Sequence, residues 1–180
     1  MSTTTQPPTT TPLITIRQAT PTDVPLILDF IRILAEYEKA PERVHATETS
    51  LKETLFGLRP FAHVVFATWE GVGEVAMALW FYNYSTWESR PGIYLEDLIV
   101  KEEYRHKGIG TILLRYLATR AVSENCARFE WAALDWNTPA INFYRQVGAK
   151  SLDEWISFRL EGPELMNFAN DQAGADQASR

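Results

Sequence analysis

The stretch Tyr94-Leu-Glu-Asp-Leu-Ile-Val-Lys-Glu-Glu-Tyr-Arg-His-Lys-Gly-Ile-Gly110 decides the fold of this chain. Apolar, largely β-favouring residues between 95 and 100 predict a strand, although the carboxylates Glu96 and Asp97 lie among them. The polar residues 101–107 predict a loop, and apolar residues spaced by three and four positions beyond it predict a helix. A glycine-bearing loop between strand and helix directs free backbone N–H groups and a helix dipole at one point. The stretch therefore predicts a phosphate or pyrophosphate site.

The glycine pattern separates this loop from two common phosphate motifs. It lacks the Gly-Lys-Ser/Thr ending of a P-loop and the third glycine of a dinucleotide-binding fingerprint. Arg105-x-x-Gly108-x-Gly110 instead resembles the coenzyme A pyrophosphate loop of the GNAT superfamily of N-acetyltransferases. Further along, Asn137-Thr-Pro-Ala-Ile-Asn-Phe-Tyr144, followed by Gly148, resembles the second GNAT signature, Asn-x-x-Ala-x-x-Phe-Tyr.

Three more segments narrow the resemblance to the spermidine/spermine N1-acetyltransferase and thialysine N-acetyltransferase branch. They are Leu34-Ala-Glu-Tyr-Glu38, Tyr94-Leu-Glu-Asp97 and Ala132-Ala-Leu-Asp-Trp-Asn137. The resemblance covers the chain from about residue 14 to about residue 160. It implies the GNAT fold, of α/β (α+β) class, with a mixed, mostly antiparallel central sheet flanked by helices on both faces. It also implies a homodimer with acceptor sites near the subunit interface.

The activity that the resemblance implies is acetyl transfer from acetyl-CoA to a primary amine, by direct attack within a ternary complex. Small aliphatic amines are the first expectation, either polyamines or lysine-like amines such as thialysine. Two alternatives stay open: a GNAT enzyme acting on an aminoglycoside-like or protein amine, and a non-catalytic acyl-CoA-binding dimeric module. The presence of both Tyr144 and Glu96 argues against the module.

By the same resemblance, the coenzyme contacts fall on the central strand, the loop after it and the starts of two helices. The predicted positions are Leu98, Ile99, Val100, Arg105, His106, Lys107, Gly108, Ile109, Gly110, Thr111, Asn137, Thr138, Pro139, Ala140 and Tyr144. The backbone of residues 98–100 would bind the pantetheine arm and the thioester carbonyl, where donors already aimed at an oxyanion stabilise it. Tyr144 is the predicted general acid, because a phenol with a pKa near 10 can return a proton to a thiolate. The alternative is a tyrosine that only packs with Phe143.

Acidic residues predict the acceptor side of the site. Glu96 resembles the carboxylate placed at the acceptor amine, where it would act as base through a water or hold the cation. Four more residues match acceptor-side positions of polyamine acetyltransferases, namely Tyr37, Glu38, Asp135 and Glu154. Asp135 is a conservative match and Glu154 a loose one. Each of these carboxylates could instead be a surface charge, and Glu96 could be structural. Asp97 is expected on the opposite sheet face unless a bulge disturbs the alternation.

Two departures from the family pattern bear on specificity. His106 and Lys107 stand where many relatives have a small residue after the arginine, and their added positive charge suits phosphate. After Gly148 the chain is shorter than in the spermidine/spermine enzymes, with Lys150-Ser-Leu-Asp-Glu-Trp155 in place of a longer acidic stretch. Because that segment helps shape the acceptor site, polyamine specificity stays open.

Composition bounds the class of protein. The 180 residues are 46% apolar and 22% charged with a net charge of -6, typical of a globular chain. Lys and Arg do not cluster outside the loop, so no nucleic-acid partner is expected, and no apolar run approaches the roughly 20 residues of a membrane span. The single Cys126 fits a reducing compartment, and a cytoplasmic location is expected. The scattered residues His45, His63 and His106 predict no metal site.

The expected organisation is a disordered Thr/Pro-rich tail over 1–12, one acetyltransferase domain over 13–162 and a largely disordered tail over 163–180. A turn of helix or a contact with a partner subunit is the alternative for 163–168. Strands are expected at 13–17, 62–70, 73–81, 94–100, 128–134 and 155–160. Helices are expected at 21–38, 47–56, 109–124 and 138–147, the first with Thr20 as its cap.

Overall fold

The computed structural model describes residues 13–171 of the chain. They form two compact units, with the boundary between Asn137 and Thr138. The first unit contains the sheet, and the second consists of helices and irregular segments.

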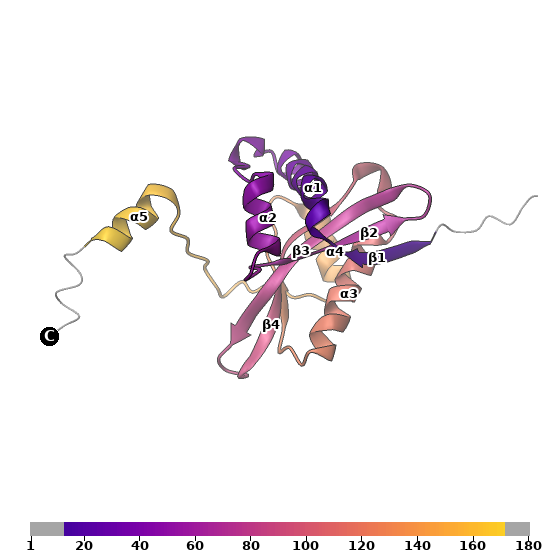
Figure 1. Cartoon of the computed structure of the whole chain (residues 1–180). Helices are drawn as coiled ribbons and strands as arrows, with labels where there is room; N and C mark the ends of the chain where they lie inside the picture. The colour runs from indigo at the N-terminus through magenta and orange to yellow at the C-terminus, as the bar shows by residue number, and fades with distance from the viewer. Residues whose placement is uncertain (1–12, 172–180) are drawn as a thin grey trace, which may run out of the picture. The chain divides into compact units, whose positions relative to one another are not determined.

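The first unit is built on a five-stranded sheet (Figure 1). Its strands are β1 (Ile14–Gln18), β2 (His63–Trp69), β3 (Gly73–Ser85), β4 (Arg90–Val100) and β5 (Phe129–Trp131). They lie side by side in sequence order, each antiparallel to the next except for β5, which is parallel to β4. The prediction of a mixed, mostly antiparallel sheet is confirmed. The hairpin of β3 and β4 is longer than predicted and β5 is shorter, because pairing rather than local apolar content sets where a strand ends.

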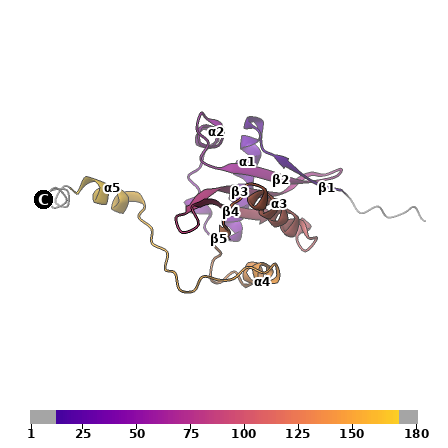
Figure 2. The same cartoon turned by 90° about the horizontal axis from the view of Figure 1, so that it is seen from below.

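Helices cover both faces of this sheet (Figure 2). They are α1 (Val24–Tyr37), α2 (Glu48–Phe56) and α3 (Ile109–Ser123), with short 3₁₀ turns η1 (Pro21–Asp23), η2 (Pro41–Arg43) and η3 (Glu102–Tyr104). Side chains alternate between the faces of a strand, and α1 and α2 bury one alternating set, namely Val64, Phe66, Met77, Leu79 and Ile99. On the opposite face α3 buries Leu113 and Leu117 completely. This arrangement confirms the predicted fold class.

The turn before α1 is anchored to the sheet. Thr20 is its N-cap and Pro21 its first helical residue, as the sequence predicts. The guanidinium of Arg17, on β1, lies 2.8 Å from the carboxylate of Asp23 and 2.8 Å from that of Glu74 on β3. This ion pair holds the pKa of Asp23 well below its usual value. The ion pairs of Arg17 thus fasten the start of α1 to β1 and β3.

The second unit contains α4 (Thr138–Gln146) and α5 (Gly162–Asn170). The predicted strand at 155–160 is wrong: these residues form neither strand nor helix, and Trp155 N donates to Leu152 O at 3.1 Å in a turn. The alternating apolar pattern indicated a strand, but a strand forms only where another strand pairs with it. The helix α5 is longer than the single turn suggested for 163–168. Residues 1–12 and 172–180, predicted as tails, lie outside the described range.

Candidate active site

The central strand β4 contains one extra residue, Glu96. Leu79 of β3 pairs with Asp97 and Trp80 pairs with Leu95, so no residue of β3 lies opposite Glu96. Such a β-bulge bends the strand and redirects side chains. The bulge therefore lies at the two carboxylates of the deciding stretch, and the simple alternation expected for Asp97 does not hold there.

The strands β4 and β5 separate at the same point. They pair only over residues 93–95 of β4, with Leu95 opposite Trp131 as the last pair. Within the described part of the chain, no strand pairs with residues 96–100 on that side. The sheet therefore has an opening beside the second half of β4.

The backbone of β4 directs two N–H groups into this opening. Lys101 N donates to Val75 O at 2.9 Å, so the backbone groups of Lys101 point towards β3. Residues along an antiparallel strand alternate in this direction, and Leu98 and Val100 therefore point the other way. The carbonyl of Val100 agrees, because it accepts a hydrogen bond from Arg105 Nε in the loop after β4. Two backbone donors along an open strand edge can bind an extended polar chain or a developing oxyanion.

The loop that follows leads directly into α3. Gly108, the residue before the helix, has a φ of 79°, a left-handed conformation that glycine adopts at no steric cost. His106 has a φ of 60°, which is uncommon for a residue with a side chain. No side chain caps the N-terminus of α3, so the N–H groups of its first turn, which contains Gly110 and Thr111, remain for a ligand. The loop and the helix start fit the anion site that the glycine pattern predicted.

Two basic side chains of the loop are held by aromatic rings. The guanidinium carbon of Arg105 lies 4.7 Å from the ring centroid of Tyr37, at the end of α1. Lys107 Nζ lies 5.2 Å from the ring centroid of Trp69 and 5.0 Å from that of Tyr104, and it donates to Glu103 O at 2.9 Å. Aromatic rings from the end of α1, the end of β2 and the loop itself therefore hold both cations in place.

The C-terminal turn of α1 also meets the segment after β5. The hydroxyl of Tyr37 donates to Oδ1 of the buried Asn137 at 3.1 Å, and the rings of Tyr37 and Trp136 are 6.4 Å apart. Lys39 Nζ lies 5.4 Å from the ring centroid of Trp136. Asp135, predicted on the acceptor side, is exposed in the same segment. The structure thus brings Tyr37, Arg105 and Asn137 together from three separate parts of the sequence.

Three carboxylates meet between the bulge and the end of α1. Asp97 is half-buried, and its pKa is raised to about 6 by loss of solvation, with further contributions from the negative charges of Glu96 and Glu38. Burial also raises the pKa of Glu38, against the opposing charge of Arg43. Carboxylates with raised pKa values are common at functional sites. Asp97 is thus a candidate that the sequence interpretation passed over, although its position beside Glu96 was the available signal.

The second unit carries the remaining predicted residues. Thr138, Pro139 and Ala140 form the first turn of α4, so Asn137 occupies the expected position before the helix. Tyr144 lies on the same helix with its ring 5.3 Å from that of Phe143, a contact compatible with either interpretation of Tyr144. Glu154 is exposed in a turn. The roles of Tyr144 and Glu154 stay predictions.

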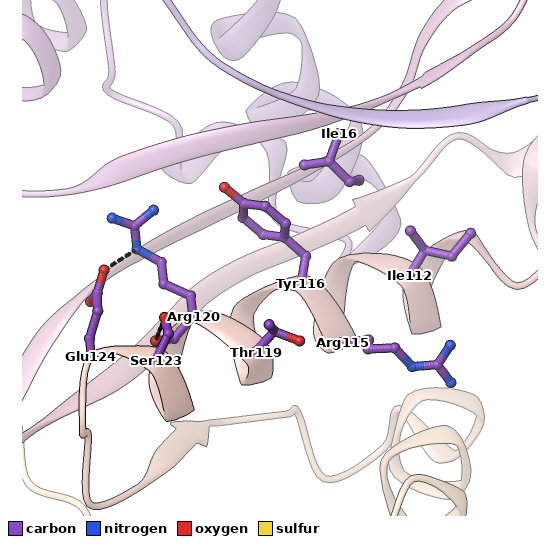
Figure 3. Close-up of a pocket in the computed structure, with 8 residues that line it drawn as sticks. All are labelled: Ile16, Ile112, Arg115, Tyr116, Thr119, Arg120, Ser123 and Glu124. Atoms are coloured by element: carbon purple, nitrogen blue, oxygen red, sulfur yellow. Dashed lines mark hydrogen bonds and ion pairs between the residues drawn. The ribbon is translucent and has the colours of Figure 1, made fainter.

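A separate cavity of about 540 Å³ lies along α3 (Figure 3). Its lining residues are Ile16, Ile112, Arg115, Tyr116, Thr119, Arg120, Ser123 and Glu124. Arg120 Nε and Glu124 Oε1 form an ion pair of 2.9 Å at one end. None of the predicted site residues lines this cavity. Among residues 13–171, no helix has the length and apolar content to cross a bilayer, and no group of three His, Cys, Asp or Glu side chains could hold a metal ion.

Comparison with known proteins identifies the family. Residues 28–149 match the model of the acetyltransferase (GNAT) family. The chain is 40% identical over 166 residues to a thialysine N-epsilon-acetyltransferase of Sus scrofa, an alignment that covers 87% of this chain and 97% of that protein. It is 34% identical over 194 residues to an L-ornithine N5-acetyltransferase of Arabidopsis thaliana, covering 83% and 85% of the two chains. A solved integron cassette protein from the mobile metagenome of V. cholerae has a TM-score of 0.74 at 26% identity, covering 88% of this chain and 98% of that one.

These matches agree with the family and the branch that the motifs predicted. The family match spans the bulge, the glycine-bearing loop and α4. The chain belongs to the acetyltransferase (GNAT) family, and it is an acetyltransferase.

Proposed function

We propose that this protein transfers acetyl from acetyl-CoA to a primary amine of a small aliphatic molecule, by direct attack in a ternary complex. The observation that carries the proposal is the opening of β4 at Glu96, directly before the basic loop and the uncapped start of α3. Thialysine and ornithine, named for two relatives, are both amino acids with a primary amine at the end of a short side chain. Lysine-like amines are therefore the first candidates and polyamines the second.

The opening beside β4 and the loop after it would bind the two ends of acetyl-CoA, the thioester and the phosphates. Phosphates would bind at the positive end of the α3 dipole, with Arg105 and Lys107 supplying charge and His106 a further hydrogen-bond donor. The thioester end would lie along β4, where the N–H groups of Leu98 and Val100 point to the open side. The remaining proposed contacts are Ile99, Gly108, Ile109, Gly110, Thr111, Asn137, Thr138, Pro139, Ala140 and Tyr144.

The proposed reaction uses two side chains, the backbone of β4 and one water molecule. The ammonium of the acceptor loses a proton to Glu96 through a water, and the free amine attacks the thioester carbon. The new C–N bond places negative charge on the carbonyl oxygen, which one of the two open N–H groups, that of Leu98 or that of Val100, stabilises, while the other binds the pantetheine arm. The C–S bond then breaks, and the coenzyme thiolate takes a proton from the phenol of Tyr144. The acetylated nitrogen gives its second proton to the resulting phenolate, which leaves a neutral amide and restores Tyr144. Glu38, Asp135 and Glu154 would attract the cationic acceptor.

Asp97 is a second candidate for the base. Its pKa of about 6 is closer to a neutral working pH than that of an ordinary carboxyl, and such matching favours proton transfer. Its carboxyl is also electrostatically coupled to Glu96 and Glu38, so the three side chains would share the proton and the cation. The raised pKa supports testing Asp97 together with Glu96.

We also propose that the protein is a cytoplasmic homodimer. The cytoplasmic location rests on the single cysteine, and the dimer rests on the family resemblance.

The proposal is tested by release of the coenzyme thiol from acetyl-CoA with a panel of acceptors. The panel contains thialysine, lysine, ornithine, putrescine, spermidine, spermine, an aminoglycoside and a lysine-containing peptide. Turnover is expected with one of the small amines. Tyr144→Phe and Glu96→Gln should each lower kcat by about 10²- to 10⁴-fold, the usual contribution of general acid–base catalysis.

The same assay contains the contrary outcomes. Turnover of only the aminoglycoside or the peptide would overturn the small-amine proposal. Full activity of Tyr144→Phe would remove the general acid from that position. If Asp97→Asn loses more activity than Glu96→Gln, the base belongs to Asp97.

A further inference from the structure

We infer that Tyr37 is a positioning residue, which sets the orientation of Arg105 for the phosphates of the coenzyme. The inference rests on the proposed function for its ligand. It replaces the acceptor contact that the sequence predicted for Tyr37 with a role on the coenzyme side.

Arg105 is constrained from two directions. Its Nε donates to Val100 O at 3.1 Å, which fixes one edge of the guanidinium against the end of β4. The ring of Tyr37 lies 4.7 Å from its central carbon, which fixes one face. No ion pair involves Arg105 among residues 13–171, so its charge is available to a ligand. A guanidinium held in plane presents its terminal N–H groups as a fork that matches a phosphate.

Tyr37 is itself held in place. It is the last residue of α1, its hydroxyl donates to Oδ1 of Asn137 at 3.1 Å, and its ring lies 6.4 Å from that of Trp136. Asn137 is only 8% exposed, so its hydrogen bond with Tyr37 is largely shielded from water. The phenol is therefore a rigid support that joins α1, the loop after β4 and the segment before α4.

The same contacts disfavour Tyr37 as an amine contact. Its hydroxyl is already used by Asn137, and one face of its ring is covered by a guanidinium. An ammonium attracted to that ring would meet the positive charge of Arg105 nearby. In the same turn the negative charge of Glu38 contributes to the raised pKa of Asp97, so Glu38 lies nearer than Tyr37 to the proposed base as a contact for an ammonium group.

The test is calorimetric binding of CoA itself to the full chain, alongside the KM of the best amine. Tyr37→Leu removes ring and hydroxyl and should weaken CoA binding by about 5- to 30-fold, the range of a cation–π contact. Tyr37→Phe keeps the ring and should weaken it by only about two- to tenfold, the range of one hydrogen bond. Neither change should move the KM of the amine by more than about twofold. The matched control is Tyr84→Phe, which removes a hydroxyl that lies 3.1 Å from that of Ser89 on an exposed turn, and CoA binding should be unchanged.

A double-mutant cycle shows whether Tyr37 acts through Arg105. Arg105→Lys removes the guanidinium that contacts the ring of Tyr37. Adding Tyr37→Leu to Arg105→Lys should therefore weaken CoA binding little further. Additive effects would overturn the inference, as would wild-type CoA affinity in Tyr37→Leu combined with a raised amine KM. A lowered melting temperature with unchanged CoA affinity would also overturn it, and if Tyr37→Leu does not fold, Tyr37→Phe decides the question. If the wild-type protein binds CoA but turns over no amine, the proposed function is contradicted. The comparison of CoA affinity among the Tyr37 and Arg105 variants would still test the inference.

Discussion

The carboxyl of Asp97 should make the free energy of unfolding depend on pH. Its pKa in the folded protein is about 6, above the 3.8 of an unperturbed aspartate, because burial and two neighbouring carboxylates disfavour its charge. The folded state therefore holds the proton more tightly than the unfolded state. The protonated carboxyl of Asp97 therefore stabilises the folded state. This contribution is complete below about pH 3.8 and is lost as the pH rises through about 6.

Asp97→Asn should make the protein more stable at neutral and alkaline pH. At pH 8 the gain should be on the order of 2–3 kcal/mol, because each unit of pKa shift corresponds to about 1.4 kcal/mol. At pH 4 the two proteins should unfold alike, since wild-type Asp97 is then largely protonated in the native state. Urea unfolding between pH 4 and pH 8 measures the difference.

Glu53→Gln is the control for this comparison, because it removes an exposed carboxylate on α2 far along the chain from the bulge. It should follow the wild-type dependence on pH. If the free energy of unfolding of Asp97→Asn changed with pH in the same way as that of wild type, the environment of Asp97 would not favour its neutral form.

Among the elements, β4 is proposed to bind the coenzyme because its bulge opens the strand edge. Deleting Glu96 removes the one residue without a partner on β3 and should restore continuous pairing from Leu95–Trp80 to Asp97–Leu79. A straighter β4 would continue beside β5 beyond Leu95, which would close the open edge along which the N–H groups of Leu98 and Val100 lie. We expect CoA affinity to fall at least about tenfold, as small misplacements of binding groups commonly cost that much or more.

Glu96→Ala separates the bulge from the carboxylate. It keeps the extra residue, so CoA affinity should stay near that of wild type, whereas turnover of the amine should fall. Circular dichroism shows whether both variants are folded, and calorimetry gives the affinities. A folded deletion variant that binds CoA like wild type would rule out the bulge as the device that opens the strand.

Local sequence patterns predicted the elements where short-range physics decides them. The strand, glycine-bearing loop and helix from β4 to α3 were predicted because apolar spacing and turn chemistry act over a few residues. The strand at 155–160 was not, because its alternation of apolar residues carries no information about a pairing partner. The extra residue at Glu96 was equally invisible to periodicity. The sequence allowed for a bulge near Asp97 without predicting one, and the effect of the bulge on Asp97 is visible only in the three-dimensional structure.

Across the whole molecule, the site depends on contacts that no local pattern contains. Tyr37 and Asn137 are 100 positions apart, and their hydrogen bond joins residues that the sequence placed in different subsites. Arg105, in the loop after β4, was predicted as a phosphate ligand, but the ring that supports it comes from the end of α1. Motifs therefore supplied most of the candidate residues, whereas the proposed role of each one depends on packing between distant segments.

The proposed homodimer is the prediction at the scale of the whole molecule. Large apolar side chains are strongly exposed in one segment of the second unit, where Trp155 is 69%, Ile156 77% and Phe158 91% exposed. Contiguous exposed apolar residues commonly mark a protein interface. Light scattering during size exclusion should give a mass of about 41 kDa, twice the 20.5 kDa of one chain.

A variant with Ile156→Ser and Phe158→Ser should give the mass of one chain. Trp87→Ser is the matched control, because Trp87 is 93% exposed on the turn between β3 and β4 and should leave the mass unchanged. If acceptor sites lie near a subunit interface, the monomeric variant should keep its affinity for CoA and lose turnover of the amine. A wild-type chain that remains at 20.5 kDa over a wide range of concentration would contradict the dimer, and the acceptor carboxylates would then have to come from a single chain.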